Sequence, residues 1–230
     1  ACSGPAMQVL FVGNSYTSVN DLPGMVSKLA ASAGQRVEAS TVAPGGWWWR
    51  DHAASAETMG AISSREWDFV VLQEQSMVPA DPKLLLGSSL PAASQMTRAA
   101  RNGGAEIVLF LTWGHRGGSR EVSQASYSSM QIALADGYQL VSERLIADIA
   151  PVGMAWWMAL EERPDINLFQ ADGSHPTLAG TYLAASVITG ILLDVDPETF
   201  TESLGLYEPT AAALRGFASR AVDGEIPWKD

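Results

Sequence analysis

Three polar residue types occur at positions where they could carry out acyl transfer through a serine nucleophile. Ser15 stands in Gly13-Asn14-Ser15, directly after an apolar run, and Asp172 precedes His175 by three residues far along the chain. A serine hydroxyl attacks a carbonyl carbon only when a base takes its proton, and imidazole suits that task near neutral pH. A carboxylate within reach can fix the tautomer of that imidazole. Ser15, His175 and Asp172 are therefore the candidate nucleophile, base and orienting acid.

Such a reaction also needs hydrogen-bond donors for the oxyanion of the tetrahedral intermediate. The backbone amide of Ser15, a glycine amide from Gly45-Gly46 and the side-chain amide of Gln73 are the candidates. Each motif alone fits a structural role equally well: Ser15 as a turn residue, and Asp172 as a helix cap. Their joint occurrence favours catalysis.

Aromatic and histidine residues follow the same predicted strands. Trp113 and His115 come after the fourth strand, where they are predicted to border a substrate pocket. Trp47 begins a run of three tryptophans, for which two interpretations stay open. The run is a platform for a sugar or an acyl group, or two of its members are core and one is surface. For His52 we predict a structural hydrogen bond.

The elements that must position these residues alternate between short apolar runs and longer helical patterns. Strands are predicted at residues 7–12, 36–43, 67–73, 106–112 and 151–155. Helices are predicted at residues 21–33, 53–63, 81–102, 122–149, 175–193 and 208–222. This alternation indicates right-handed crossovers and a parallel sheet covered on both faces. Ligands bind beyond the carboxyl ends of such strands, so the loops with the polar residues are predicted to meet at one edge.

Composition excludes several classes of protein. The chain has 230 residues, 47% of them hydrophobic, which argues against wholesale disorder. A formal net charge of -11 leaves no electrostatic footprint for nucleic acid or for an anionic membrane surface. A single cysteine excludes an internal disulfide framework and a cysteine-based zinc site. Residues 178–193 are too short an apolar stretch for a transmembrane span. Residues 1–230 are predicted to form one domain.

That cysteine, Cys2, stands in Ala1-Cys2-Ser3-Gly4, which resembles the end of a bacterial lipoprotein signal peptide. Under this interpretation residues 1–6 are an exported lead-in, Cys2 carries a lipid anchor, and the protein resides in the cell envelope or periplasm. The alternative is an incidental cysteine.

Taken together, Gly13-Asn14-Ser15, Gly46 and Asp172-x-x-His175-Pro176 resemble the motifs of the SGNH (GDSL-like) hydrolase family. The resemblance spans nearly the whole chain. It implies a flavodoxin-like three-layer α/β/α sandwich with a five-stranded parallel sheet. It also implies ester hydrolysis or deacetylation without a metal or other cofactor, through an acyl-enzyme on Ser15. Gly46 would then be an oxyanion-hole amide, with Gly45 as the alternative.

The third block of the family departs from this pattern. The family usually shows Gly-x-Asn-Asp there, whereas this chain has Leu72-Gln73-Glu74-Gln75-Ser76. We assign the role of the missing asparagine to Gln73, with Gln75 as the second choice. The expected substrate is an acetyl or short acyl ester of a small molecule or carbohydrate. The alternatives are a non-catalytic carbohydrate-binding envelope protein and an acyltransferase.

Overall fold

A five-stranded sheet lies at the centre of the computed structural model, which describes residues 5–229. Its strands are β1 (Met7–Val12), β2 (Val37–Val42), β3 (Phe69–Leu72), β4 (Glu106–Phe110) and β5 (Asp148–Ala150). All neighbouring strands pair in parallel, in the order β2-β1-β3-β4-β5. Cys2, the predicted lipid anchor, lies outside the described residues.

Apolar side chains on both faces of β1 explain why this strand is buried in the middle of the sheet. Successive side chains of a strand point to opposite faces. Val9 and Phe11 accordingly belong to one apolar core, and Leu10 and Val12 belong to the other. A strand that is covered on both faces has a continuous apolar run in its sequence, and β1 has such a run.

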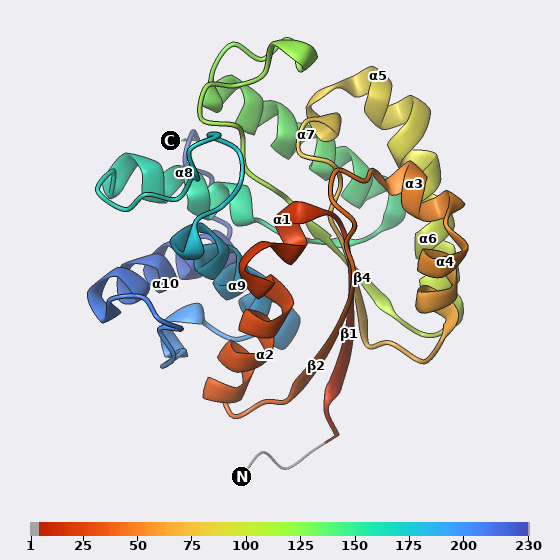
Figure 1. The fold of residues 1–230 in the computed structure, drawn as a ribbon, viewed down its shortest axis with the longest axis horizontal. Helices are drawn as coiled ribbons and strands as arrows, with labels where there is room; N and C mark the ends of the chain where they lie inside the picture. The colour runs from red at the N-terminus through yellow and green to blue at the C-terminus, as the bar shows by residue number, and fades with distance from the viewer. Residues whose placement is uncertain (1–4, 230) are drawn as a thin grey trace.

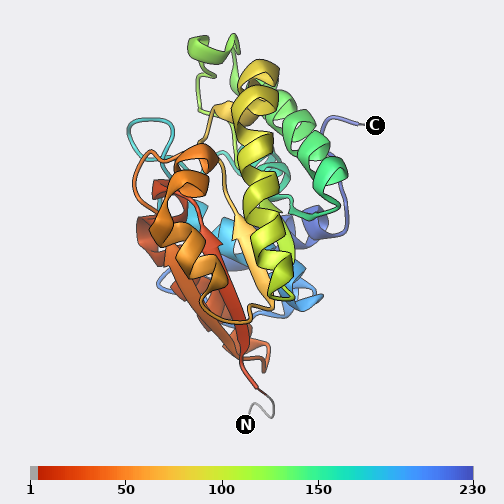
Figure 2. The same cartoon turned by 90° about the vertical axis from the view of Figure 1, so that its right-hand side faces the viewer.

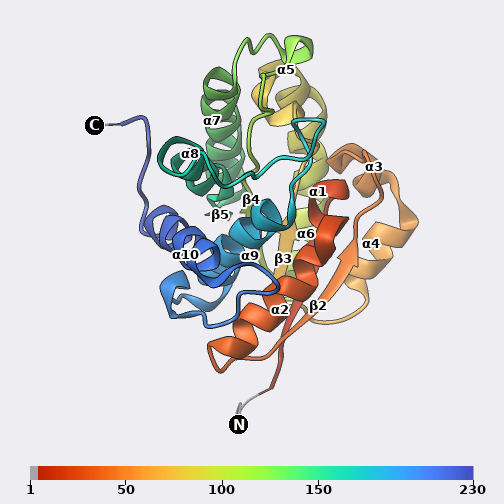
Figure 3. The same ribbon diagram turned by 60° about the vertical axis from the view of Figure 1, so that its left-hand side comes forward.

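Helices cover both faces of the sheet, which confirms the predicted three-layer α/β/α sandwich (Figures 1, 2 and 3). One face packs against α2 (Leu22–Ser32), α8 (Val152–Glu162), α9 (Leu178–Leu193) and α10 (Glu208–Val222). The other packs against α3 (Trp49–Ala54), α4 (Ala56–Ser63), α6 (Leu90–Asn102) and α7 (Tyr127–Leu145). Two short helices, α1 (Ser15–Ser18) and α5 (Pro82–Leu84), lie near the carboxyl ends of the strands (Figure 1).

The register of the sheet brings the carboxyl ends of the strands to one edge. Val12 at the end of β1 lies beside Val42 of β2 on one side and Leu72 of β3 on the other. The chain runs from β1 to β2 and then crosses back to place β3 on the opposite side of β1. Such a reversal opens a crevice between the loops that follow the two inner strands, here β1 and β3.

The fifth strand is shorter and earlier than predicted. Residues 148–150 form β5, whereas residues 151–155, predicted as a strand, include the start of α8. Val152–Glu162 is a buried helix with apolar residues around most of its circumference, and periodicity alone does not separate such a helix from a buried strand.

Two helical predictions also need correction. The predicted helix 53–63 is two helices, because Ser55 has an extended backbone and caps α4 by accepting a hydrogen bond from the Thr58 amide. The predicted helix 122–149 is α7, which begins after the capping residue Ser126 and ends where Ile146 turns left-handed. Within residues 5–229, no helix combines the length and the apolar character needed to cross a membrane.

Candidate active site

Ser15 is positioned by a tight connection between β1 and α1. Gly13 is required there, since a Cβ at this position would overlap Thr17 Oγ1 and Gln73 Oε1. Asn14 then caps α1 by accepting a hydrogen bond from the Tyr16 amide at 3.1 Å. Ser15 is therefore the first residue of a short helix that begins immediately beyond the sheet edge.

A chain of two hydrogen bonds joins Ser15 to a base and an acid. Ser15 Oγ lies 2.9 Å from His175 Nε2, and His175 Nδ1 lies 2.6 Å from Asp172 Oδ2. Asp172 Oδ1 accepts the backbone N–H of both Ser174 and His175 at 2.9 Å. Hydrogen bonds from the Ser174 amide, which has the larger effect, and from the His175 side chain lower the pKa of Asp172 to about 2. The ionised carboxylate favours the tautomer with the proton on Nδ1, which leaves Nε2 free to accept from Ser15.

An aromatic stack supports the loop that carries His175. The ring of Tyr16 stacks on Trp113 at 4.6 Å, and Trp113 stacks on Trp156 at 3.9 Å. Tyr16 also meets the His175 ring edge-on at 5.6 Å, and its hydroxyl lies 2.6 Å from Ser174 Oγ. Burial raises the pKa of Tyr16 to about 12, so its hydroxyl stays neutral.

The prediction that Trp113 binds substrate is corrected by its burial. Its side chain is 0% exposed, and its Nε1 donates to the carbonyl oxygen of Ser174 at 2.9 Å. It lies beneath the site and holds the loop of His175 from below.

Ser15 lines a cleft with a volume of about 280 Å³. Nine residues line it: Asn14, Ser15, Tyr16, Gly46, Gln75, Ser76, His115, Ser174 and His175. The structure thus brings together five of the residues singled out from the sequence (Ser15, Gly46, Gln75, His115 and His175) and places Asp172 behind His175.

Trp47 is not among the residues that line the cleft. It packs edge-on against His52 with ring centroids 5.0 Å apart, while Trp49, two residues on, is fully buried. His52 has the predicted structural role, since its Nε2 donates to the Gly13 carbonyl at 2.7 Å and its Nδ1 contacts Thr58 Oγ1 at 3.0 Å.

Gly46 reaches the cleft through a backbone conformation that favours glycine. Its φ of +75° is left-handed, and the Asn14 side chain holds the same loop by donating to the Trp47 carbonyl at 3.1 Å. Gly45, the alternative, does not line the cleft.

The prediction that the Gln73 side-chain amide is an oxyanion-hole donor is wrong. Gln73 is buried under α1, where its Oε1 accepts from the Asn14 amide and the Thr17 hydroxyl, both at 2.9 Å. Its Nε2 donates to the Glu74 carbonyl. Gln75, the second choice, lines the cleft instead. Gln75 Oε1 accepts from the Met77 amide at 2.8 Å, while Nε2 has no partner among the described residues.

A buried carboxyl group, which the sequence did not single out, links the two loops that flank the cleft. Glu74 Oε1 accepts the backbone N–H of Trp49 at 2.8 Å and of Gln75 at 2.7 Å. Burial raises the pKa of Glu74 to about 7. One side chain thereby fixes the position of Gln75 relative to the segment that follows Gly46.

A second serine–histidine contact lies in the same cleft and was also not predicted. Ser76 Oγ is 3.0 Å from His115 Nε2. Burial lowers the pKa of His115. Sequence could have pointed to Ser76 only through its place in the loop after β3, because its partner is 39 residues away.

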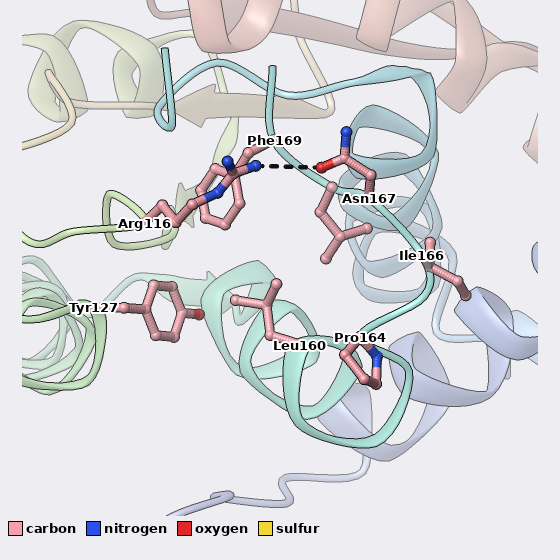
Figure 4. A pocket seen from close by; sticks show the side chains of 8 residues that line it. Arg116, Tyr127, Leu160, Pro164, Ile166, Asn167 and Phe169 are labelled. Carbon is pink, nitrogen blue, oxygen red and sulfur yellow. Dashed lines mark hydrogen bonds between the residues drawn. The ribbon is translucent and has the colours of Figure 1, made fainter. Parts of the chain in front are cut away.

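A separate pocket of about 430 Å³ lies next to the loop that ends at His175 (Figure 4). Arg116 lies over the Phe169 ring at 5.2 Å and donates to Asn167 Oδ1 at 3.3 Å. This pocket shares no lining residue with the Ser15 cleft, so the consecutive residues His115 and Arg116 line different cavities. Among residues 5–229, no three His, Cys, Asp or Glu side chains group closely enough to hold a metal ion.

Comparison with known proteins assigns the chain to a family. No family model matches the chain, and no curated protein matches it either. Among solved structures, a protein of Slackia heliotrinireducens described as an SGNH hydrolase is 30% identical. That match covers 82% of this chain and 100% of the other, with a TM-score of 0.69.

Two further structures share the fold at lower identity. A DUF4886 family protein of Bacteroides uniformis is 15% identical, with a TM-score of 0.84 and 96% of each chain covered. An acetylxylan esterase of Geobacillus stearothermophilus is 12% identical, with a TM-score of 0.61 and coverage of 84% of this chain and 95% of the other. The three-layer fold and the 30% identity over the full length of the first structure lead to one assignment: the chain belongs to the SGNH hydrolase family.

Proposed function

We propose that the protein is a carboxylic ester hydrolase that works through an acyl-enzyme on Ser15. The observation that carries this proposal is the continuous chain from Ser15 Oγ to His175 Nε2 at 2.9 Å and from His175 Nδ1 to Asp172 at 2.6 Å. Nucleophile, base and orienting acid are in contact in the order that acyl transfer requires.

In the first half-reaction, Ser15 Oγ forms a bond to the ester carbonyl carbon as its proton passes to His175 Nε2. The oxyanion is held by the backbone amides of Ser15 and Gly46 and by the side-chain amide of Gln75. Collapse of the intermediate breaks the bond to the alcohol oxygen, which takes the proton from His175. Asp172 stays ionised and stabilises the imidazolium throughout.

In the second half-reaction, water attacks the acyl-enzyme and gives a proton to His175 Nε2. Collapse of the second intermediate returns that proton to Ser15 Oγ and releases the carboxylic acid. The same donors hold the second oxyanion, so one site serves both steps.

The cleft supports a short acyl group, such as acetyl, on a polar alcohol. Its volume is about 280 Å³, and none of the nine residues that line it has an aliphatic side chain. A long alkyl chain would therefore have no aliphatic side chain to pack against, whereas an acetyl group needs none. A small-molecule or carbohydrate ester is therefore the proposed substrate class.

The test is whether Ser15 is the reactive serine. We expect a fluorophosphonate probe to label the wild-type protein at Ser15, and Ser15→Ala to lower kcat on p-nitrophenyl acetate by about 10⁴–10⁶-fold. Mass spectrometry of the labelled peptide identifies the site. A Ser15→Ala variant that folds and turns over the ester at the wild-type rate would refute the proposal.

A further inference from the structure

The cleft contains a second serine–histidine pair that the mechanism above does not use. Ser76 Oγ lies 3.0 Å from His115 Nε2, and both residues line the cleft together with Ser15. The side chain of His115 is partly exposed to the cleft, and Ser76 is 7% exposed.

This pair lacks the group that would make Ser76 a nucleophile. His115 Nδ1 has no hydrogen-bond partner among residues 5–229, whereas the corresponding nitrogen of His175 contacts Asp172. The backbone amide of His115 is held by Met130 Sδ at 3.3 Å, which fixes the residue without orienting its ring as a base. Ser76 and His115 are therefore suited to hydrogen bonding and not to covalent catalysis.

Neighbouring hydroxyl groups extend the pair into a polar wall. The Tyr16 hydroxyl lies 2.6 Å from Ser174 Oγ, and both residues line the cleft together with Ser76. Burial raises the pKa of Tyr16 and lowers the pKa of His115, so both groups are uncharged near neutral pH. Hydroxyl and neutral imidazole groups can each donate and accept a hydrogen bond.

Such a wall matches a ligand hydroxyl better than an ion. No lysine or arginine is among the nine lining residues, and the ionised Asp172 stands behind His175. An anionic substrate would find no cation in the cleft and would be repelled by that carboxylate. A neutral hydroxyl group can both donate to and accept from the pair.

We infer that Ser76 and His115 form a subsite that binds a free hydroxyl group on the alcohol part of the ester, so that the substrate is a short acyl ester of a neutral polyol. This inference rests on the proposed function, which assigns the acyl part to Ser15. Because the alcohol leaves when the acyl-enzyme forms, the subsite acts on acylation and not on the deacylation that follows.

The test compares two substrates that form the same acetyl-enzyme. One is a mono-O-acetylated methyl glycoside with free hydroxyl groups, and the other is p-nitrophenyl acetate. We expect Ser76→Ala to lower kcat/KM on the glycoside about 5- to 10-fold, which is the effect of losing one neutral hydrogen bond. The kcat/KM of the same variant on p-nitrophenyl acetate should fall less than about twofold. Equal losses on both substrates, or none on either, would overturn the inference.

Two controls keep the test interpretable. Ser63→Ala makes the same chemical change at an exposed position at the end of α4, and it is expected to alter neither value. If Ser76→Ala does not fold, His115→Gln tests the same subsite by changing the other of its two residues.

A binding measurement separates this inference from the proposed function. In a Ser15→Ala background, NMR titration with the same acetylated glycoside requires no turnover. Adding Ser76→Ala should weaken the Kd about 5- to 10-fold. Unchanged Kd values would reject the subsite even if Ser15 is the nucleophile. A weakened Kd alongside a wild-type protein without esterase activity would reject only the proposed reaction.

Discussion

The two serine–histidine pairs in the cleft have nearly the same contact and different surroundings. The distance from Oγ to Nε2 is 2.9 Å for Ser15 and His175 and 3.0 Å for Ser76 and His115. Only His175 has a carboxylate on its Nδ1. A serine next to a histidine is therefore not enough to propose a nucleophile, and the carboxylate on Nδ1 of the histidine is the feature that distinguishes Ser15 from Ser76.

The difference originates in the loops that carry the histidines. His175 follows Asp172 in a turn whose backbone amides point at the carboxylate, so the acid and the base are placed by the same few residues. His115 lies in the loop after β4, which ends at Phe110, and the Gly114 amide donates to the Gln131 side chain at 2.8 Å. The loop after β4 therefore fixes the position of His115 but places no carboxylate next to its ring.

Removing the acid is the most direct way to make the two pairs alike. In Asp172→Asn, His175 loses the carboxylate that fixes its tautomer, and we expect kcat/KM on p-nitrophenyl acetate to fall about 10³–10⁴-fold. Asp165→Asn is the matched control, because Asp165 lies earlier in the same loop and, within residues 5–229, forms an ion pair only with Arg163. An Asp172→Asn variant with wild-type activity would show that the pairs do not differ in the way proposed.

The pH dependence of the wild-type enzyme sharpens the same point. The folded protein lowers the pKa of Asp172 from 3.8 to about 2, so the carboxylate stabilises the fold above about pH 4. That contribution is lost as the pH falls towards 2. Asp172 therefore stays ionised in mild acid, and a loss of kcat/KM measured there does not come from protonation of this carboxylate.

The next largest effect separates Gln75 from Gln73. We expect Gln75→Ala to lower kcat about 10²–10³-fold, because an oxyanion donor is lost. Gln73→Ala should instead lower the free energy of unfolding by about 1–3 kcal/mol, since the buried Asn14 amide loses its acceptor. Steady-state kinetics and urea denaturation of both variants distinguish the roles. A kinetic loss confined to Gln73→Ala, without a loss of stability, would reverse the assignment.

The smallest effect concerns Glu74, which holds the backbone next to Ser76. Its pKa is about 7 in the folded protein against an ordinary value of 4.5, so the folded state binds the proton more tightly. The free energy of unfolding should therefore decline as the pH rises from about 4.5 to about 7. In Glu74→Gln this decline should be reduced, and kcat should change less than about tenfold, because the amide oxygen can still accept from Trp49 and Gln75.

Denaturation at about pH 5 and about pH 8 measures the effect of Glu74→Gln. Glu57→Gln, on the exposed side of α4, is the control for a surface carboxylate. A decline of equal size in wild type and Glu74→Gln would mean that Glu74 is not its source.

Much of the fold and part of the site were predictable from sequence. The apolar run at residues 178–193 and the segment 208–222 match α9 and α10. The residues Ser15, Asp172 and His175 could be paired because each stands next to a recognisable element boundary. Alternation of strands and helices then placed them at one edge of a parallel sheet.

The other features of the site depend on contacts between distant segments, and such contacts leave no local pattern in the sequence. Gln73 and Gln75 have the same side chain and stand two residues apart, and only the turn of the chain after Leu72 decides which one enters the cleft. Trp113 after β4 would suit a pocket wall equally well, until the rings of Tyr16 and Trp156 close over its two faces. The contact of Ser76 with His115 joins two loops that no sequence signal relates.

The turn that contains Asp172 and His175 has a consequence for how the protein folds. Acid and base are three residues apart, so their contact closes a very short loop and costs little chain entropy. The contact between Ser15 and His175 joins residues 160 positions apart, and it cannot form until the first strand and the α9 layer have docked. The charged half of the site can thus assemble locally, while the serine meets its base only when the tertiary structure is nearly complete.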